Sequence, residues 1–392
     1  MPVLVDNGPN PPAGHAGCLE VGLVNSVPDA ALEATERQFI ELIDAAAGDI
    51  PVRLRFFSLP DVPRTTRGQQ HVSKSYLGIG DLWDGRLDAL IVTGTEPRAA
   101  ALSEEPYWPA LAELIDWAEH NTISTIWSCL AAHAAVLQLD GVARHALDDK
   151  CFGIFDCAKV GDHPLMKDVP SSMPVPHSRW NGLRESELAS RGYDILTRSA
   201  RAGVDSFAKQ GRSLFVFFQG HPEYDAASLL GEYRRDVGRF LRGERETFPA
   251  MPKNYFDAAT AGLLAAFRAR ARMDRREELL ADFPLAAAER SLTNVWRPSA
   301  ARIYRNWLAH LSAQKAARTT LDAFAGAARA SLARASLASV WPGAAAASVQ
   351  AAGDRIRRAP FIERRRTNDS SGLYSGARDR RISAQREPIP VE

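Results

Sequence analysis

One cysteine of this 392-residue chain lies where a strand is expected to turn into a helix. Cys129 follows the β-branched and aromatic segment 122–128 and precedes the alanine-rich segment 130–141. At the start of a helix, the helix dipole and the free backbone N–H groups lower the pKa of a thiol and can hold an oxyanion. On this stretch alone a buried core cysteine is the simpler interpretation, so a nucleophilic role for Cys129 needs partners.

The segment "FFQGHPEYD" (217–225) supplies such partners. Pro222 favours an extended conformation for His221, and in an extended segment the residues i and i+2 face the same way. The Glu223 carboxylate is therefore placed to hold one ring nitrogen of His221 and to fix its tautomer. The alternative is that His221 only ends a strand, but together with Cys129 the segment predicts a nucleophile, a base and a carboxylate that orients the base.

Other residues that could do chemistry give weaker signals. Cys151 and Cys157 are separated by five intervening residues and have no neighbouring Cys/His pair, so we expect buried packing and no metal site. His133 lies one helical turn after Cys129 and is expected to pack or to face solvent. His177 either lines a pocket or belongs to a loop held by its own hydrogen bonds. The sequence has no phosphate-binding glycine loop, Walker motif or H-E-x-x-H pattern, so we expect no bound ATP, NAD or zinc.

The elements that must position these residues alternate along the chain. Strands are expected at 19–26, 52–59, 87–94 and 122–128 and in the segments "KCFGIFDC" and "LFVFFQG", and helices at 29–48, 107–121 and 130–141. This alternation predicts an α/β fold with a doubly wound, mostly parallel sheet of the flavodoxin-like type, with its chemistry in loops at the carboxyl ends of the strands.

The last third of the chain is expected to be helical and then increasingly polar. Residues 226–312 read as helices, including a helical insertion at 258–290. Residues 313–392 carry 14 Lys+Arg against 7 Asp+Glu, whereas residues 1–312 carry 34 against 40. We therefore divide the chain into an N-terminal extension (1–18), an α/β domain (19–312) and an Ala/Arg-rich tail (313–392) whose last 35 or so residues are expected to be disordered.

Composition indicates a globular protein, with 45% hydrophobic and 24% charged residues. The longest apolar runs are far shorter than the roughly 20 residues of a membrane-spanning helix, and the first residues lack a secretion signal. Four scattered cysteines do not form a disulfide framework. The cytoplasm is the expected location, without a membrane partner. The tail arginines lack interleaved aromatic residues, so nucleic-acid binding is not expected.

Several of these segments resemble one known family, the homoserine O-acyltransferases of the homoserine O-succinyltransferase type, which act in methionine biosynthesis and share the fold of class I glutamine amidotransferases. The similar pieces include "DALIVTG" (88–94), the segment from Tyr107 to Val136 around Cys129, "PHSR" (176–179), "GHPEYD" (220–225) and "RRDV" (234–237). The similarity runs over about residues 19–312, interrupted at 258–290.

The resemblance implies roles for individual residues. The acyl-thioester nucleophile of the family falls on Cys129, its general base on His221 and its third catalytic residue on Glu223. Its amino-acid-binding residues match Lys150, Ser178 and Arg235. The implied reaction is a ping-pong transfer from an acyl-CoA co-substrate, succinyl-CoA or acetyl-CoA, to homoserine, without a bound cofactor. A homodimer is also implied.

The sequence departs from the family in two loops near the expected site. The loop 25–39 lacks the family's lysine near the oxyanion position, and Arg98 occupies the position that separates succinyl from acetyl donors. Arg98 could pair with the free carboxylate of a succinyl group, or it could point to solvent. Serine or another hydroxy compound remains possible as the acceptor, and so does O-acetyl transfer. Two further alternatives are a glutamine-amidotransferase-like hydrolase and a binding module without catalysis.

Overall fold

The computed structural model describes residues 3–6 and 17–338 of the chain. The chain forms two units, residues 1–327 and 328–392. The described residues 328–338 of the second unit are helical and belong to the helix α10. The predicted disordered end of the Ala/Arg-rich tail lies outside the described residues. The proposed division of the chain at residues 18 and 312 stays a prediction.

One mixed sheet organises the first unit, with ten strands in the order β1-β3-β2-β4-β5-β10-β9-β8-β6-β7. The strands are β1 (Val3–Val5), β2 (Leu19–Val24), β3 (Val52–Phe57), β4 (Ala89–Val92), β5 (Ser124–Ser128), β6 (His145–Lys159), β7 (Ser172–Gly182), β8 (Asp194–Ser199), β9 (Gly203–Gln210) and β10 (Leu214–Phe218).

The sheet changes character at β10. From β1 to β10 all neighbouring strands are parallel, as expected from the alternation of strands and helices. From β10 through β9, β8 and β6 to β7 all neighbours are antiparallel. The α/β class and the parallel part are confirmed. Of the strands in the antiparallel part, only β6 and β10 were predicted, and their antiparallel pairing was not. β7 was missed because it contains two prolines, and β8 and β9 because they are rich in polar residues.

Helices cover both faces of the parallel strands, as a doubly wound fold requires. The helices of eight or more residues are α1 (Leu32–Ala47), α2 (Thr66–Ser75), α4 (Trp108–Asn121), α5 (Leu130–Asp140), α7 (Ser228–Leu241), α8 (Ala258–Met273) and α10 (Arg297–Ala338), and the shorter ones are α3 (Ile79–Asp84), α6 (Glu185–Ser190) and α9 (Leu285–Arg290). None of the helices in the described ranges is long and apolar enough to cross a membrane.

Alternating side chains of the central strands pack in two different cores. On β4, Ile91 packs with α1 and the first turns of α10, whereas Leu90 and Val92 pack with α4 and α5 on the other face. Successive residues of a strand point to opposite faces, so a continuous apolar strand is buried on both sides. This explains why "LDALIVTG" contains almost no polar residue.

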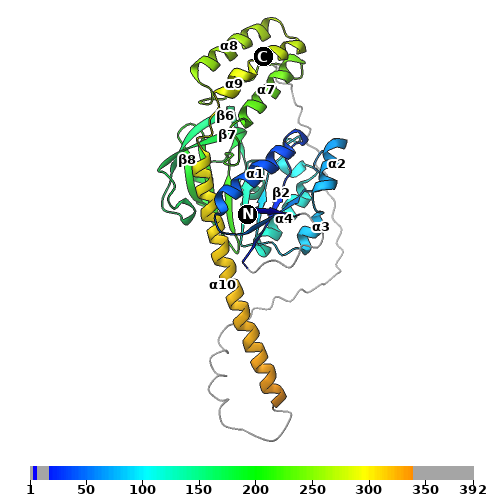
Figure 1. The fold of residues 1–392 in the computed structure, drawn as a ribbon, viewed down its shortest axis with the longest axis vertical. Coiled ribbons are helices and arrows are strands. Elements are labelled where there is room, and N and C mark those ends of the chain that lie inside the picture. Colours follow the sequence, from blue (N-terminus) through cyan, green and yellow to red (C-terminus); the bar gives the residue numbers. More distant parts are fainter. Residues whose placement is uncertain (1–2, 7–16, 339–392) are drawn as a thin grey trace, which may run out of the picture. The chain divides into compact units, whose positions relative to one another are not determined.

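A third core joins the end of the sheet to the later helices. Phe152 and Ile154 of β6 pack with α7, α8 and α9, which Figure 1 shows gathered beside β6 and β7. The predicted insertion 258–290 contains α8 and α9, and its buried Leu264 and Phe267 belong to the same core. The loop before α8 pairs with the sheet as well, since the Lys253 amide donates to Phe152. These contacts fix α7 over the strands that carry the site.

Candidate active site

Cys129 occupies a strained turn between β5 and α5. Its backbone has φ 55° and ψ −115°, a left-handed conformation that few residues other than glycine adopt. Its N–H donates to the carbonyl of Phe218 on β10, at 2.7 Å. Such a conformation costs about 1–3 kcal/mol and persists only where the surroundings impose it. The structure thus places Cys129 at the expected strand-to-helix turn, partly exposed.

His221 and Glu223 follow the neighbouring strand. In the register of the sheet, Phe218 of β10 lies opposite Ser128 of β5, so the residues after both strands meet at one edge. His221 Nδ1 lies 2.8 Å from Glu223 Oε1, and both residues are buried. The His221 N–H donates to the Pro176 carbonyl at 2.8 Å. The predicted carboxylate contact with the imidazole is therefore present.

Opposing effects act on the pKa of His221. Burial lowers the pKa of His221. The negative charge of Cys129, the Glu223 carboxylate and hydrogen bonds to both raise it by more, so the pKa lies well above its ordinary value. Because Nδ1 of His221 faces Glu223, Nε2 is the ring atom that can hydrogen-bond to the Cys129 sulfur. A negative charge on the neighbouring sulfur thus favours the protonated form of His221.

Tyr224 connects the segment of His221 and Glu223 to α7. Its ring stacks on His221 with centroids 4.1 Å apart and planes 15° apart. Its hydroxyl donates to Glu232 Oε1 at 2.8 Å. Burial and the nearby carboxylates raise its pKa well above the ordinary value, so it stays a neutral donor. The imidazole is thus held by Glu223 at its edge and by Tyr224 on its face.

The residues matched to amino-acid binding meet around Glu232. The Ser178 hydroxyl donates to Glu232 Oε2, and Lys150 Nζ lies 3.5 Å from the same oxygen. Lys150 Nζ also lies 4.0 Å above the Phe152 ring. Three predicted positions on β6, β7 and α7 are therefore brought to one side of His221, because Arg235 follows Glu232 by one helical turn on α7.

Arg235 and Asp236 complete this group. Arg235 Nε and Nη2 both lie 3.2 Å from Asp236 Oδ1, and 41% of the Arg235 side chain is exposed. Burial lowers the pKa of Arg235, but Asp236 and Glu232 raise it more. Sequence reasoning did not select Glu232. The signal was available, since Glu232, Arg235 and Asp236 stand at i, i+3 and i+4 of one helix face.

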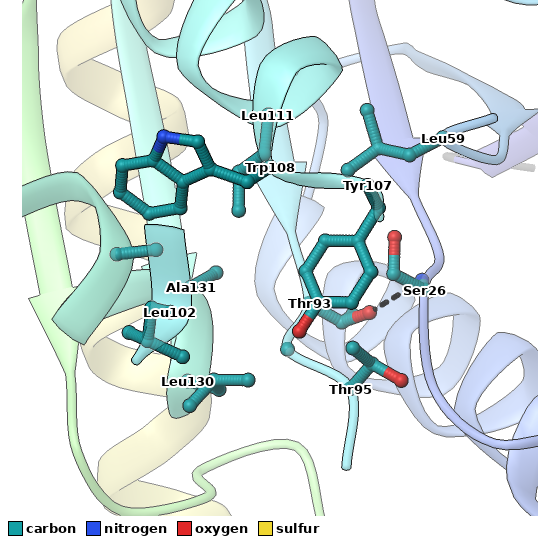
Figure 2. Close-up of a pocket in the computed structure, with 12 residues that line it drawn as sticks. Ser26, Leu59, Thr93, Thr95, Leu102, Tyr107, Trp108, Leu111, Leu130 and Ala131 are labelled. Atoms are coloured by element: carbon teal, nitrogen blue, oxygen red, sulfur yellow. Dashed lines mark hydrogen bonds between the residues drawn. The ribbon is translucent and has the colours of Figure 1, made fainter. Parts of the chain in front are cut away.

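A small pocket lies beside the first turn of α5 (Figure 2). In Figure 2 the side chains of Ser26, Thr93 and Tyr107 lie across the pocket from Leu130. The Ser26 and Tyr107 hydroxyls are buried and have no hydrogen-bond partner in the described part of the chain. The first amides of a helix have no partner within it, so polar groups and the start of α5 surround a space next to Cys129.

Gly94 closes against the start of α5 more tightly than any other residue type allows. A Cβ there would lie 2.8 Å from the Leu130 nitrogen and 2.6 Å from its Cβ. The pocket includes both residues. The absence of a side chain at Gly94 therefore lets the end of β4 approach the Leu130 amide.

Arg98 lies in the loop that follows this glycine. Its N–H and that of Ala99 donate to the buried Glu105 carboxylate, at 2.5 and 2.7 Å, and the residue is exposed. Glu96 of the same loop lies 3.6 Å from Arg239 on α7. The structure thus fixes the backbone of this loop, and Glu96 links the loop to α7.

His133 is a packed core histidine. Its Nε2 lies 2.9 Å from Gln219 Oε1, and burial, with Gln219 opposing, lowers its pKa to about 3. It is therefore neutral near pH 7. His133 joins α5 to the end of β10 and takes no part in charge transfer.

A second thiol, imidazole and carboxylate lie together inside the sheet. One ligand-type atom each of Cys157, His177 and Asp205 lie within 4.8 Å of one another. Cys157 is fully buried within β6, its thiol donates to the Phe155 carbonyl at 3.7 Å, and burial raises its pKa. A thiol that is closed off and kept protonated is not a nucleophile. Of the two alternatives given for His177, the loop is wrong, because His177 lies in β7.

The family model "Homoserine O-succinyltransferase" matches residues 12–318. The homoserine O-succinyltransferase of Rhodopseudomonas palustris is 52% identical over 315 residues, covering 80% of this chain and 95% of that protein. The protein of the same name from Methylorubrum extorquens is 50% identical over 294 residues, 75% of this chain and 87% of that protein.

Among solved structures, a glutamine amidotransferase from Methylobacillus flagellatus is similar with a TM-score of 0.42 and 15% identity, covering 75% of this chain and 95% of that one. The sheet order defines an α/β fold whose parallel strands carry Cys129 at a strand-to-helix turn, next to His221 and Glu223. The sequence matches specify it further. The chain belongs to the homoserine O-succinyltransferase family and is an acyltransferase.

Proposed function

We propose that this chain transfers an acyl group from acyl-CoA to the hydroxyl of homoserine, in methionine biosynthesis, by a ping-pong reaction through a thioester on Cys129. The observation that carries the proposal is the arrangement of Cys129, His221 and Glu223 at one edge of the sheet, with the His221 and Glu223 atoms 2.8 Å apart. Family membership supplies the substrate class.

In the first half-reaction the Cys129 thiolate attacks the thioester carbonyl. The negative charge on the carbonyl oxygen is received by the Leu130 amide at the start of α5, which the missing side chain of Gly94 leaves accessible. The carbon–sulfur bond to CoA then breaks, and the departing CoA thiolate takes the proton of the His221 imidazolium. Cys129 is left as a neutral thioester and His221 as a neutral imidazole.

The loss of the thiolate charge prepares the second half-reaction. Because Cys129 is the main charge that raises the pKa of His221, acylation lowers that pKa and turns His221 into a base. His221 then accepts the proton of the homoserine hydroxyl, and the oxygen attacks the thioester. The ester leaves, the thiolate re-forms, and the charge pair of the free enzyme is restored.

The acceptor site suits a zwitterionic amino acid. Arg235 and Lys150 can bind an α-carboxylate, for which a guanidinium offers two parallel N–H groups. The Glu232 carboxylate, already the meeting point of Ser178, Lys150 and Tyr224, can bind the α-ammonium. An amino acid held there has its side chain directed to His221, against which Tyr224 stacks.

The donor is succinyl-CoA in this proposal, with the free carboxylate near Arg98. The loop of Arg98 is fixed by Glu105 and by the contact of Glu96 with α7. No cofactor is needed, since acyl-CoA is consumed as a co-substrate. We also propose a homodimer, and a cytoplasmic location because a catalytic thiol has to stay reduced.

Labelled acyl-CoA without an acceptor tests the proposal. Intact mass should show one succinyl adduct on the wild type and on Cys157→Ala, and none on Cys129→Ala, because only Cys129 is placed to react. Added homoserine should discharge the adduct to the ester. An adduct that Cys157→Ala abolishes would overturn the assignment of the nucleophile, and hydrolysis of glutamine without any adduct would support an amidotransferase-like hydrolase instead.

A further inference from the structure

A buried chain of polar side chains runs beneath the segment that carries His221. Arg179 Nε donates to His177 Nδ1 at 3.4 Å, and His177 Nε2 lies 3.3 Å from Asp205 Oδ1. The other carboxylate oxygen of Asp205 accepts from the Thr197 hydroxyl at 2.7 Å. The Arg179, His177 and Asp205 side chains are 5% exposed or less.

The direction of the chain follows from its donors. A guanidinium has no acceptor, so Nδ1 of His177 accepts and its proton resides on Nε2, facing Asp205. Burial lowers the pKa of His177, and Asp205 opposes this effect. The ring lies between the Arg179 guanidinium and the Asp205 carboxylate. His177 Nε2 and Asp205 Oδ1 face each other without the alignment of a full hydrogen bond.

This chain touches the catalytic turn directly. A Cβ on Gly220 would lie 2.6 Å from Asp205 Oδ1 and 3.0 Å from His177 Cε1, so the backbone of Gly220 rests on both side chains. The turn is tied down on each side, since the Gln219 N–H donates to the Asp205 carbonyl and the His221 N–H to the Pro176 carbonyl.

Successive side chains of strand β7 point to opposite faces of the sheet, one toward the buried polar chain and the other toward Glu232. His177 and Arg179 point into the sheet, whereas Ser178 between them reaches Glu232 at the acceptor site. Buried charges of this kind are poor stabilisers compared with apolar side chains of similar size. Their presence directly beneath a catalytic segment is therefore better explained by positioning than by stability.

We propose that Arg179, His177 and Asp205 form a positioning chain. The chain supports the Gly220 backbone and thereby fixes the position of the His221 ring relative to Cys129. The proposal rests on the proposed function, because it assigns His221 the role of acid and base. These three are positioning residues, which act through the turn and do not touch the substrate.

His177→Leu and His177→Gln test the chain in the full-length protein. Leucine removes both polar contacts, whereas glutamine keeps a donor that can face Asp205. We expect kcat of His177→Leu to fall about 10- to 100-fold, the scale of a displacement of ~1 Å at a catalytic group. His177→Gln should recover kcat to within about fivefold of the wild type, with KM for homoserine within about threefold in both variants, since the acceptor groups of α7 stay in place.

Asp205→Asn provides a second variant with nearly unchanged size, and Cys157→Ala is the matched control, because it alters the same buried group without breaking the chain. Asp205→Asn should lower kcat and leave KM for homoserine unchanged, and Cys157→Ala should change neither. If Asp205→Asn and His177→Leu fold and retain kcat within about twofold, or if kcat and KM move together in every variant, the positioning role is overturned. Failure of the proposed function is distinguishable, since the wild type itself would then form no adduct on Cys129.

Discussion

Gly94→Ala tests whether the Leu130 amide receives the oxyanion. The added Cβ would lie 2.6 Å from Leu130 Cβ and 2.8 Å from its nitrogen, and ordinary contacts begin near 3.4 Å. The end of β4 and the first turn of α5 must therefore separate by about 0.8 Å, and a displacement of ~1 Å costs about 100-fold in rate. Loss of one oxyanion donor costs about 10²- to 10³-fold, so kcat/KM should fall within that range.

The assay follows CoA release and the adduct on Cys129 in a single turnover. Gly262→Ala is the control, because no atom lies within 4 Å of its Cβ position on α8. It should keep full activity and gain up to about 1 kcal/mol in stability. A folded Gly94→Ala enzyme that retains kcat/KM within about threefold of the wild type would refute the contribution of the Leu130 amide.

The remaining predictions concern charges. Glu223→Gln removes a charge that raises the pKa of His221, so the basic limb of the pH profile for acylation should move to lower pH, because acylation needs the imidazolium; an unmoved limb would contradict this role. Glu232→Gln should raise KM for homoserine about 10- to 100-fold, the scale of a lost charged hydrogen bond, without slowing adduct formation, and slowed acylation would instead place Glu232 in the first half-reaction. Arg98→Ala should reduce the preference for succinyl-CoA over acetyl-CoA; an unchanged ratio of kcat/KM values would remove Arg98 from donor selection.

The parallel part of the fold could be predicted because its strands are continuous apolar runs. Segments such as "LDALIVTG" are buried on both faces, which leaves a clear pattern. The antiparallel strands lack this pattern. Thr197 and Asp205 are buried polar residues of β8 and β9 that hydrogen-bond to each other, and Asp205 also faces His177 of β7. No local periodicity reveals such pairs.

Contacts between site residues could be predicted where the residues are close in the sequence. They could not be predicted where the packing of a helix brings distant residues together. His221 and Glu223 are two residues apart in an extended segment, so their contact follows from strand geometry. Glu232 meets Ser178 and Lys150 only because α7 packs over β6 and β7. Likewise, His177 stands next to Ser178 in the sequence but acts on the opposite face of β7.

The backbone conformation of Cys129 implies a conflict between the stability of the fold and the reactivity of the site. With φ at 55°, this position is one that glycine would occupy without strain, whereas cysteine costs about 1–3 kcal/mol there. Selection for a robust fold alone would therefore replace the cysteine. A cysteine at this position therefore uses part of a small stability margin, as the nucleophilic role that we propose for Cys129 requires.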